Sequence, residues 1–377
     1  MPSPELRLLL LALGTGRERA RAGAAALVAG VDPGRLLELA ALHGVSALLQ
    51  LLLQGVDATP APLREELLAR ARGSAARAAL LRAQMLAALG LLEARGVEAL
   101  VLKGPALAAR WEGPGLRESS DLDLLVRRAD APRAWEALQA GGWREMFPAG
   151  PRAAVLRTER EQPFVDGGPF PLDLHWGLHD PHVWPVDEDA LWATAAPFDP
   201  ALPGVRGLGP VEGFVHLVQH GARHLWERLA WVADLGRVLP PGAPLPPGVT
   251  ERARRLGATR ALELALALRR EALGLDPPVP IDPVPERLLA AVRAGWEGRG
   301  GPRPLRSLAL QLELRTTVRA RARLLLGELL IPTAEERALL PLPPALDPLL
   351  APVRLLRLLA KHARRARSSP DSLPVCR

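Results

Sequence analysis

The stretch DLDLLV at residues 121–126 decides the fold, because it alternates polar and apolar side chains and then becomes fully apolar. This pattern is typical of a strand that runs from an exposed edge into a buried core. A short apolar run at 98–102, a turn at 103–105 and a short helical segment at 106–111 precede it. We therefore expect a strand, a helix and a second strand in succession near the centre of the chain.

The residues that follow extend this pattern. A helix is expected over 131–140, where Gly141 and Gly142 end it. Further strands are expected over 153–157 and 170–176, and the second alternates Leu172, Asp173, Leu174 and His175. Together these elements predict a small mixed sheet core of the α+β (mixed α/β) class over residues 97–200.

Both flanks of this core show apolar residues at helical spacing. Residues 1–96 predict about four helices, one of them over 36–52, with a proline-containing break at 57–62. Residues 201–377 predict helices over 211–225, 230–239, 251–273, 285–296 and 305–330. We therefore expect three parts: an N-terminal helical region (1–96), the α/β core (97–200) and a C-terminal helical region (201–377).

Composition and charge exclude several classes of protein. The 377 residues are 48% hydrophobic and 24% charged, which is ordinary globular usage and not that of a disordered or collagen-like chain. The single cysteine, Cys376, excludes an intrachain disulfide. Near the N-terminus the longest apolar run, 8–13, is too short for a membrane helix or a signal peptide. We expect a soluble, cytoplasmic protein with no membrane partner, and the formal charge of +7 permits anionic partners.

Elimination directs the search for chemistry to carboxylates. The sequence contains no phosphate-binding P-loop, no nucleophile elbow and no HExxH zinc motif. Asp121 and Asp123 lie two residues apart on the expected strand, so both point to one face. Asp173 alternates with its neighbours on a strand that could lie beside the first. Such carboxylates can bridge a pair of Mg²⁺ ions, although a single Asp-x-Asp is also common at solvated strand ends.

An ordered set of motifs resembles the polymerase-β-like nucleotidyltransferase superfamily, and within it the branch of uncharacterised bacterial nucleotidyltransferases. The set runs from about residue 33 to residue 240, and its members are HGV at 43–45, VLKGPAL at 101–107, RESSDLDLLV at 117–126, LDLHW at 172–176, and HGARHLW at 220–226 followed by Asp234. The resemblance implies a nucleotidyltransferase-type mixed sheet and an activity that consumes a nucleoside triphosphate.

The resemblance also implies roles for particular residues. Asp121, Asp123 and Asp173 would be the catalytic residues and the ligands of two Mg²⁺ ions. The glycine-serine turn that cradles phosphates in the family corresponds here to Lys103-Gly104-Pro105. No serine follows the glycine, and proline has no N–H to offer a phosphate.

The same turn supplies the expected nucleotide-binding residues. Lys103 can provide a point charge beside Gly104, and Arg117 precedes the aspartates at a distance suited to a phosphate. The alternatives are that Lys103 caps the strand and that Arg117 is an exposed turn residue.

The histidines form two groups. His216, His220 and His224 recur every four residues, but eight residues of helix span about 12 Å, too far for one zinc ion. We expect that face to pack on the core, with His220 or His224 near the nucleotide or the acceptor. His175 is expected to share a face with Asp173, whereas His179 and His182 are expected in loops.

These observations predict a Mg²⁺-dependent enzyme that moves a nucleoside monophosphate, most often AMP in the superfamily, from a nucleoside triphosphate to a hydroxyl of a small molecule or protein. Two alternatives remain. One is an RNA-directed nucleotidyltransferase that holds RNA on the arginine-rich segments 315–323 and 361–367. The other is a non-catalytic nucleotide-binding module, which the missing serine favours.

Overall fold

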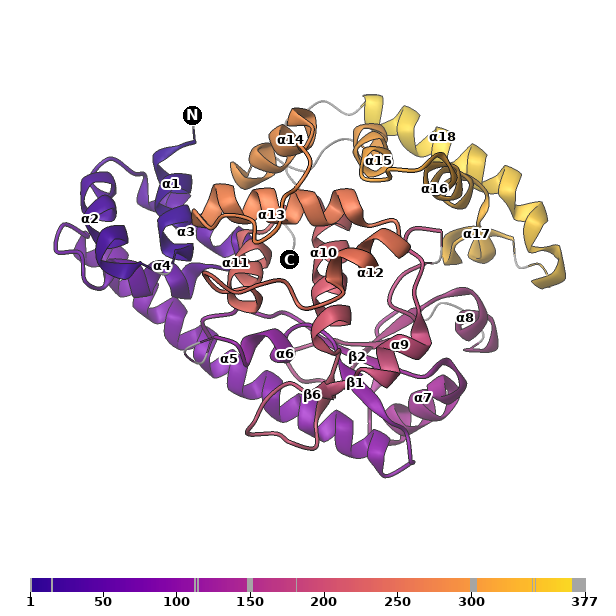
Figure 1. Cartoon of the computed structure of the whole chain (residues 1–377). Helices are drawn as coiled ribbons and strands as arrows, with labels where there is room; N and C mark the ends of the chain where they lie inside the picture. The colour runs from indigo at the N-terminus through magenta and orange to yellow at the C-terminus, as the bar shows by residue number, and fades with distance from the viewer. Residues whose placement is uncertain are drawn as a thin grey trace.

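The computed structural model describes residues 2–14, 16–111, 113, 115–147, 152–180, 182–298, 304–340, 342 and 344–367. Figure 1 shows the long helix α5 running diagonally along one side of the molecule, with the sheet against its lower half. The C-terminal helices form an arc over the opposite side. Cys376 and the tail around it lie outside the described residues.

The core is a mixed seven-stranded sheet in the order β3-β4-β5-β2-β1-β7-β6. Its strands are β1 (Ala99–Val101), β2 (Leu122–Val126), β3 (Arg144–Glu145), β4 (Glu161–Val165), β5 (Leu172–His175), β6 (Ala196–Pro197) and β7 (Arg206–Gly207). Strand β2 pairs antiparallel with β1 and parallel with β5. The predicted α+β class with a mixed sheet is confirmed.

One face of this sheet is a hydrophobic core. Leu122 and Leu124 of β2 and Leu172 and Leu174 of β5 are fully buried there. They pack against α5 (Ala61–Glu93) and α7 (Ala131–Ala140) in one cluster. Because side chains alternate along a strand, the residues between these leucines project from the opposite face.

The N-terminal region contains five helices: α1 (Pro4–Leu13), α2 (Arg17–Val28), α3 (Pro33–His43), α4 (Ser46–Leu53) and α5. The single helix expected over 36–52 is wrong, because Gly44 adopts φ +64° and ends α3. Gly44 is a left-handed helix cap of the kind that glycine favours, and the chain restarts as α4 after one more residue.

Helix α5 has an unusual surface. Among the described helices, it is the one long and apolar enough to cross a membrane by length and composition, with a mean hydropathy of 1.4 over 18 residues. In the structure its residues Leu81, Met85 and Leu92 are buried in the core beneath the sheet, while 22% of that window is buried overall. A helix of a globular core passes the same test, and the absence of a membrane partner stays a prediction.

The rest of the chain is helical between and after the strands. The helices are α6 (Pro105–Ala108), α8 (Arg152–Thr158), α9 (Glu188–Ala193), α10 (Pro210–Arg223), α11 (Leu229–Val238), α12 (Val249–Arg255), α13 (Thr259–Leu273), α14 (Glu286–Trp296), α15 (Pro304–Glu313), α16 (Val318–Leu330), α17 (Ala334–Leu339) and α18 (Ala351–Arg367), with 3₁₀ turns at Arg128–Asp130 and Pro344–Leu350.

Two long helices expected here are each split into two. The helix expected over 251–273 breaks after α12 at Gly257, which adopts φ +67°. The helix expected over 305–330 breaks before α16, where the Thr317 side chain accepts a hydrogen bond from the Ala320 amide and caps the new helix.

The N-terminal and C-terminal helices share one hydrophobic cluster, which extends from Leu6 in α1 to Leu314 after α15. A buried hydrogen bond of 2.9 Å joins the His43 ring to the carbonyl of Trp296 and ties α3 to α14. The two helical regions therefore pack around a common core, and the boundaries proposed at 96 and 200 stay predictions.

The strand expected over 153–157 is wrong, because these residues lie in helix α8. Val155 is the one buried residue of α8 among the described positions. The segment therefore buries one side chain, whereas a strand with one buried face would bury every second side chain. The antiparallel neighbour of β5 is instead β4, which the sequence did not indicate.

Candidate active site

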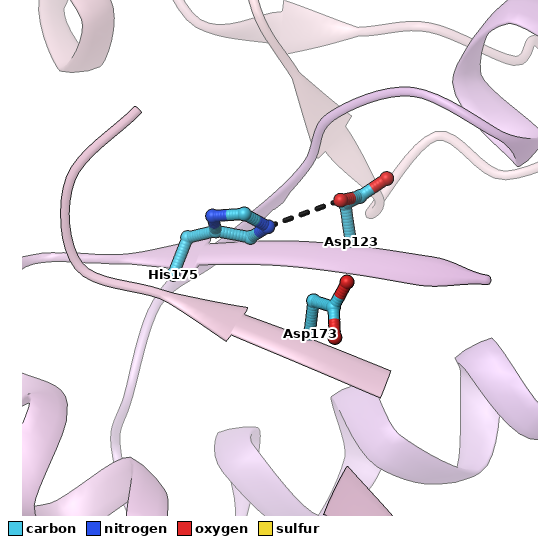
Figure 2. Close-up of side chains that lie close together, drawn as sticks. All are labelled: Asp123, Asp173 and His175. Carbon is cyan, nitrogen blue, oxygen red and sulfur yellow. Dashed lines mark hydrogen bonds and ion pairs between the residues drawn. The ribbon is translucent and has the colours of Figure 1, made fainter. Parts of the chain in front are cut away.

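The expected carboxylates meet on the face of the sheet opposite the hydrophobic core. In the parallel pair of β2 and β5, Asp123 lies directly opposite Asp173. His175 follows two residues later on β5 and so projects to the same face. Ligand atoms of Asp123, Asp173 and His175 all lie within 4.8 Å of one another. Figure 2 shows the three side chains on the two neighbouring strands.

His175 links two carboxylates. Its Nε2 lies 3.0 Å from Oδ1 of Asp123, and its Nδ1 lies 3.0 Å from Oε2 of Glu161 on β4. Burial alone would lower the pKa of His175, but these two partners raise it to about 10. The ring is therefore a cation at neutral pH, with Nε2 donating a hydrogen bond to Asp123 and Nδ1 in an ion pair with Glu161.

Asp123 is the most strongly compensated carboxylate of the group. It is 2% exposed, and Lys103 at the end of β1 places Nζ 3.3 Å from its Oδ1. Burial opposes ionisation, but Lys103 and His175 hold the pKa of Asp123 well below its usual range. Oδ2 of the same carboxylate is buried and has no hydrogen-bond partner among the described residues.

Asp173 and Asp121 have weaker compensation than Asp123. Burial raises the pKa of Asp173 to about 6, and the charges of Asp123, Glu161 and Asp121 add to the rise against the opposing effect of His175. Burial and the neighbouring Asp123 also raise the pKa of Asp121. The face therefore holds more negative charge than its own cations neutralise.

The donor set fits a divalent cation. Asp123 and Asp173 could hold it through oxygen atoms, the ligands that Mg²⁺ prefers, and the unpartnered Oδ2 of Asp123 is available for this purpose. Asp121 lies outside the group of converging ligand atoms, so its role as a metal ligand stays a prediction. His175, protonated and shared between two carboxylates, orients Asp123.

The turn at Lys103-Gly104-Pro105 leads from β1 into α6 beside the carboxylates. Gly104 adopts φ +45°, a conformation that L side chains rarely adopt. A Cβ on Gly104 would lie 3.4 Å from the carbonyl oxygen of Asp121 and 3.8 Å from Oγ of Ser119. A serine hydroxyl therefore lies next to this turn, although none follows Gly104 in the sequence.

Arg117 has a structural role that the sequence did not show. It is 8% exposed, and its Nε lies 2.9 Å from Oδ1 of the fully buried Asp234 on α11. Its Nη1 donates to Oγ of Ser119 at 2.6 Å and to the carbonyl of Gly104 at 3.4 Å. Arg117 thus fastens the Gly104 turn to the helical region, and direct contact with a phosphate stays a prediction.

Four histidines, His179, His216, His220 and His224, form a row of neighbouring rings that ends at Trp231. Ring centroids are 5.3 Å apart for His179 and His216, 4.8 Å apart for His220 and His224, and 5.0 Å apart for His220 and Trp231. Burial, followed by nearby charges that include Lys103, lowers the pKa of each histidine in the row, so the rings are neutral.

The position of His179 differs in one respect from the expectation. It does lie in a loop, between β5 and α9, but it is 5% exposed and rests on His216. Neither ring nitrogen of His179 or of His216 has a hydrogen-bond partner among the described residues. The row therefore presents unused donors and acceptors near the acidic face.

A comparison with family models matches residues 29–274, more than half of the chain, to a family described as uncharacterised nucleotidyltransferase. No curated protein and no solved structure matches the chain significantly. The match covers every residue of the acidic face, the Gly104 turn and the histidine row. The chain therefore belongs to this family of uncharacterised nucleotidyltransferases.

Proposed function

We propose that the protein transfers a nucleoside monophosphate, AMP in the leading case, from a nucleoside triphosphate to a hydroxyl group of a small molecule or protein. The observation that carries the proposal is that Asp123 lies directly opposite Asp173 in the parallel pair of β2 and β5. Oδ2 of Asp123 is buried there and has no hydrogen-bond partner among the described residues. Membership of a nucleotidyltransferase family supports it.

In this proposal Asp121, Asp123 and Asp173 hold two Mg²⁺ ions. Bound there, the ions would withdraw charge from the α-phosphate and lower the pKa of an acceptor hydroxyl. His175 and Glu161 fix the orientation of Asp123 from the other side. The carboxylates are held in place by the sheet register, so little reorganisation accompanies binding.

Lys103 and the Gly104 turn are proposed to receive the phosphates beyond the reacting one. The Lys103 ammonium already faces the acidic face, and it is 20% exposed. Ser119 stands beside Gly104 in space, which places a hydroxyl where the turn itself offers none. The loss of serine from the turn therefore argues less for a non-catalytic module than the sequence alone suggests.

Asp173 is proposed to take the proton of the attacking hydroxyl. Its position suits this role, because Asp173 lies directly opposite Asp123 on the face that would hold the metal ions. The acceptor oxygen bonds to the α-phosphorus while the bond from that phosphorus to the oxygen bridging to the β-phosphate breaks, which releases pyrophosphate. The proton leaves to solvent when Asp173 ionises again.

The RNA-directed alternative loses part of its support. Arg315 in the basic segment 315–323 is 1% exposed, lies 3.6 Å above the Trp184 ring and donates to the carbonyl of Val183. It belongs to the core and does not present its charge to a polyanion. The side chains of 361–367 lie outside the described part of the chain.

The proposal is tested by heat denaturation with each of the four nucleoside triphosphates, with and without Mg²⁺, followed by an assay of pyrophosphate release. A ligand that binds only the folded state raises the melting temperature. We expect one nucleotide to do so in a Mg²⁺-dependent manner. Asp57→Asn, which removes an exposed carboxylate far from the site in sequence, serves as the control for Asp173→Asn in both measurements. A protein that none of the four nucleotides stabilises would contradict the proposal.

A further inference from the structure

A cavity of about 830 Å³ lies beside the acidic face, between α5, α6, the segment that leads into β2 and the start of α11. Its volume is in the range of small-molecule sites. Lys103, Asp121, Asp123 and Asp173 do not line it. It is therefore a separate compartment next to the candidate metal site.

One wall of the cavity is held firmly. Oγ of Ser74 on α5 donates to the carbonyl of Gly115 at 2.7 Å. Gly115 adopts φ +74°, and a Cβ there would lie 2.4 Å from the backbone nitrogen of Ala75. The segment that carries Ser119 and Ser120 into β2 thus rests directly on α5, and the compartment is preformed.

The lining combines apolar and cationic groups. Alanine, leucine and methionine side chains of α5 and α6 line it, together with five arginines and two carboxylates. Three of the arginines are already paired: Arg70 with Glu66, Arg82 with Asp199, and Arg117 with Asp234.

The other two arginines have no such partner. Arg77 lies over the Phe170 ring at 4.8 Å and Arg228 over the Trp231 ring at 5.9 Å. In the part of the chain that the structure describes, neither has a carboxylate within ion-pair distance. Each of the two leaves a guanidinium available to an anion.

The cavity borders the acidic face. Ser119 and Ser120 line the cavity and directly precede Asp121. Arg228 also lines it, and its charge lowers the pKa of Asp121 against the effect of burial. The cavity and Asp121 are therefore neighbours, joined by one short segment of chain.

We propose that this cavity binds the acceptor substrate and that the acceptor is an organic anion, with an apolar body against α5 and a phosphate or carboxylate group between Arg77 and Arg228. This inference rests on the proposed function. A nucleoside triphosphate must place its phosphates at the aspartates, which do not line the cavity. An acceptor needs to bring only one hydroxyl to them, so the neighbouring compartment suits it.

The test is isothermal titration calorimetry of the full chain with naphthyl phosphate and with naphthoate, the two anionic arms, and with naphthol as the uncharged analogue. We expect at least one anion to bind and naphthol to bind at least about tenfold more weakly. Arg77→Gln and Arg228→Gln are expected to weaken anion binding about tenfold each. Arg72→Gln, an exposed arginine of α5 outside the cavity, is the matched control and leaves binding unchanged.

Three results would overturn the inference: neither anion binds, binding is insensitive to both arginine variants, or ATP displaces the anion and Arg77→Gln weakens ATP binding equally. The last result would assign the cavity to the nucleotide. Failure of the proposed function looks different. In that case no nucleotide binds or turns over, while the anion still binds in an Arg77-dependent manner as a ligand without a transfer reaction.

Discussion

Strands β2 and β5 have two faces of opposite character. On one face Leu122, Leu124, Leu172 and Leu174 are fully buried and pack against α5 and α7. On the other face the intervening residues are Asp123, Asp173 and His175. The same two strands therefore carry both part of the hydrophobic core and a concentration of charged side chains.

The difference shows how the fold supports an unfavourable site. Burial of carboxylates costs free energy unless cations or hydrogen bonds compensate it. Asp123 is compensated by Lys103 and His175, but Asp173 is not. Burial of the leucine face stabilises the fold and offsets the free-energy cost of burying the carboxylates. A bound cation would neutralise the negative charge that Lys103 and His175 leave.

The largest expected effect separates activity from stability at one residue. Asp173→Asn should lower turnover by about a thousandfold, the upper end of what losing one group that stabilises transition-state charge costs. It should not lower the free energy of unfolding, because it removes a carboxylate whose ionisation burial already disfavours. Pyrophosphate release and urea denaturation measure the two quantities. A clear loss of stability would show that Asp173 is compensated.

The Arg117 to Asp234 pair provides a contrast, because it is a buried charge pair that is complete without a ligand. Arg117→Met should destabilise the fold by about 4 kcal/mol, since it leaves the Asp234 charge buried and unpaired. Adding Asp234→Leu should restore much of the loss, and urea denaturation of the single and double variants measures both. A single variant as stable as the wild type would contradict the structural role of Arg117.

The leucine face should respond to truncation in the opposite way from the acidic face. Leu174→Ala is expected to cost about 3 kcal/mol of unfolding free energy, because it opens a cavity among fully buried side chains. The affinity for nucleotide, measured by calorimetry at a temperature where the variant is folded, should stay within about twofold. A large loss of affinity with little loss of stability would break the division between the two faces.

The smallest effect is a pH dependence. The pKa of Asp173 is about 6 in the folded state and near 4 in the unfolded state, so between these values the folded state holds a proton that the unfolded state has lost. Its contribution to stability therefore falls as pH rises from about 4 to about 6. Two pKa units correspond to roughly 3 kcal/mol, and solvent screening of the partly exposed carboxyl reduces this to roughly 2 kcal/mol.

Comparing the wild type with Asp173→Asn in the presence of EDTA isolates this contribution from those of the other groups. The stability advantage of the variant should grow over that pH interval and stay constant above it. An advantage that is flat with pH would show that the Asp173 carboxyl is not perturbed.

The parts of the fold that follow strict periodicity could be predicted from the sequence. Helix α7 occupies the expected residues 131–140, and β1, β2 and β5 lie within their expected runs. These segments are long or bounded by clear turn residues. The helices expected over 36–52 and 251–273 are wrong in being continuous. Gly44 and Gly257 interrupt them, because both adopt a left-handed conformation that apolar periodicity does not report.

The expected site residues come together only in part. Asp123, Asp173 and His175 converge as the strand alternation suggested. The contact of Glu161 with His175 could not be predicted from the sequence. It lies on β4, where Pro163 argues against a strand, although Gln162 and Phe164 alternate as buried residues. The pairing of Arg117 with Asp234 is equally invisible in sequence, since 117 positions separate them and only the tertiary fold joins them.

The central claim is that the acidic face holds divalent cations with the nucleotide. Electron paramagnetic resonance of Mn²⁺, titrated with a non-hydrolysable ATP analogue into the wild type and into Asp173→Asn, tests it most directly. The account predicts tight, nucleotide-dependent Mn²⁺ binding in the wild type and its loss in the variant, with Asp57→Asn unchanged. Equal Mn²⁺ binding by the wild type and Asp173→Asn would contradict it.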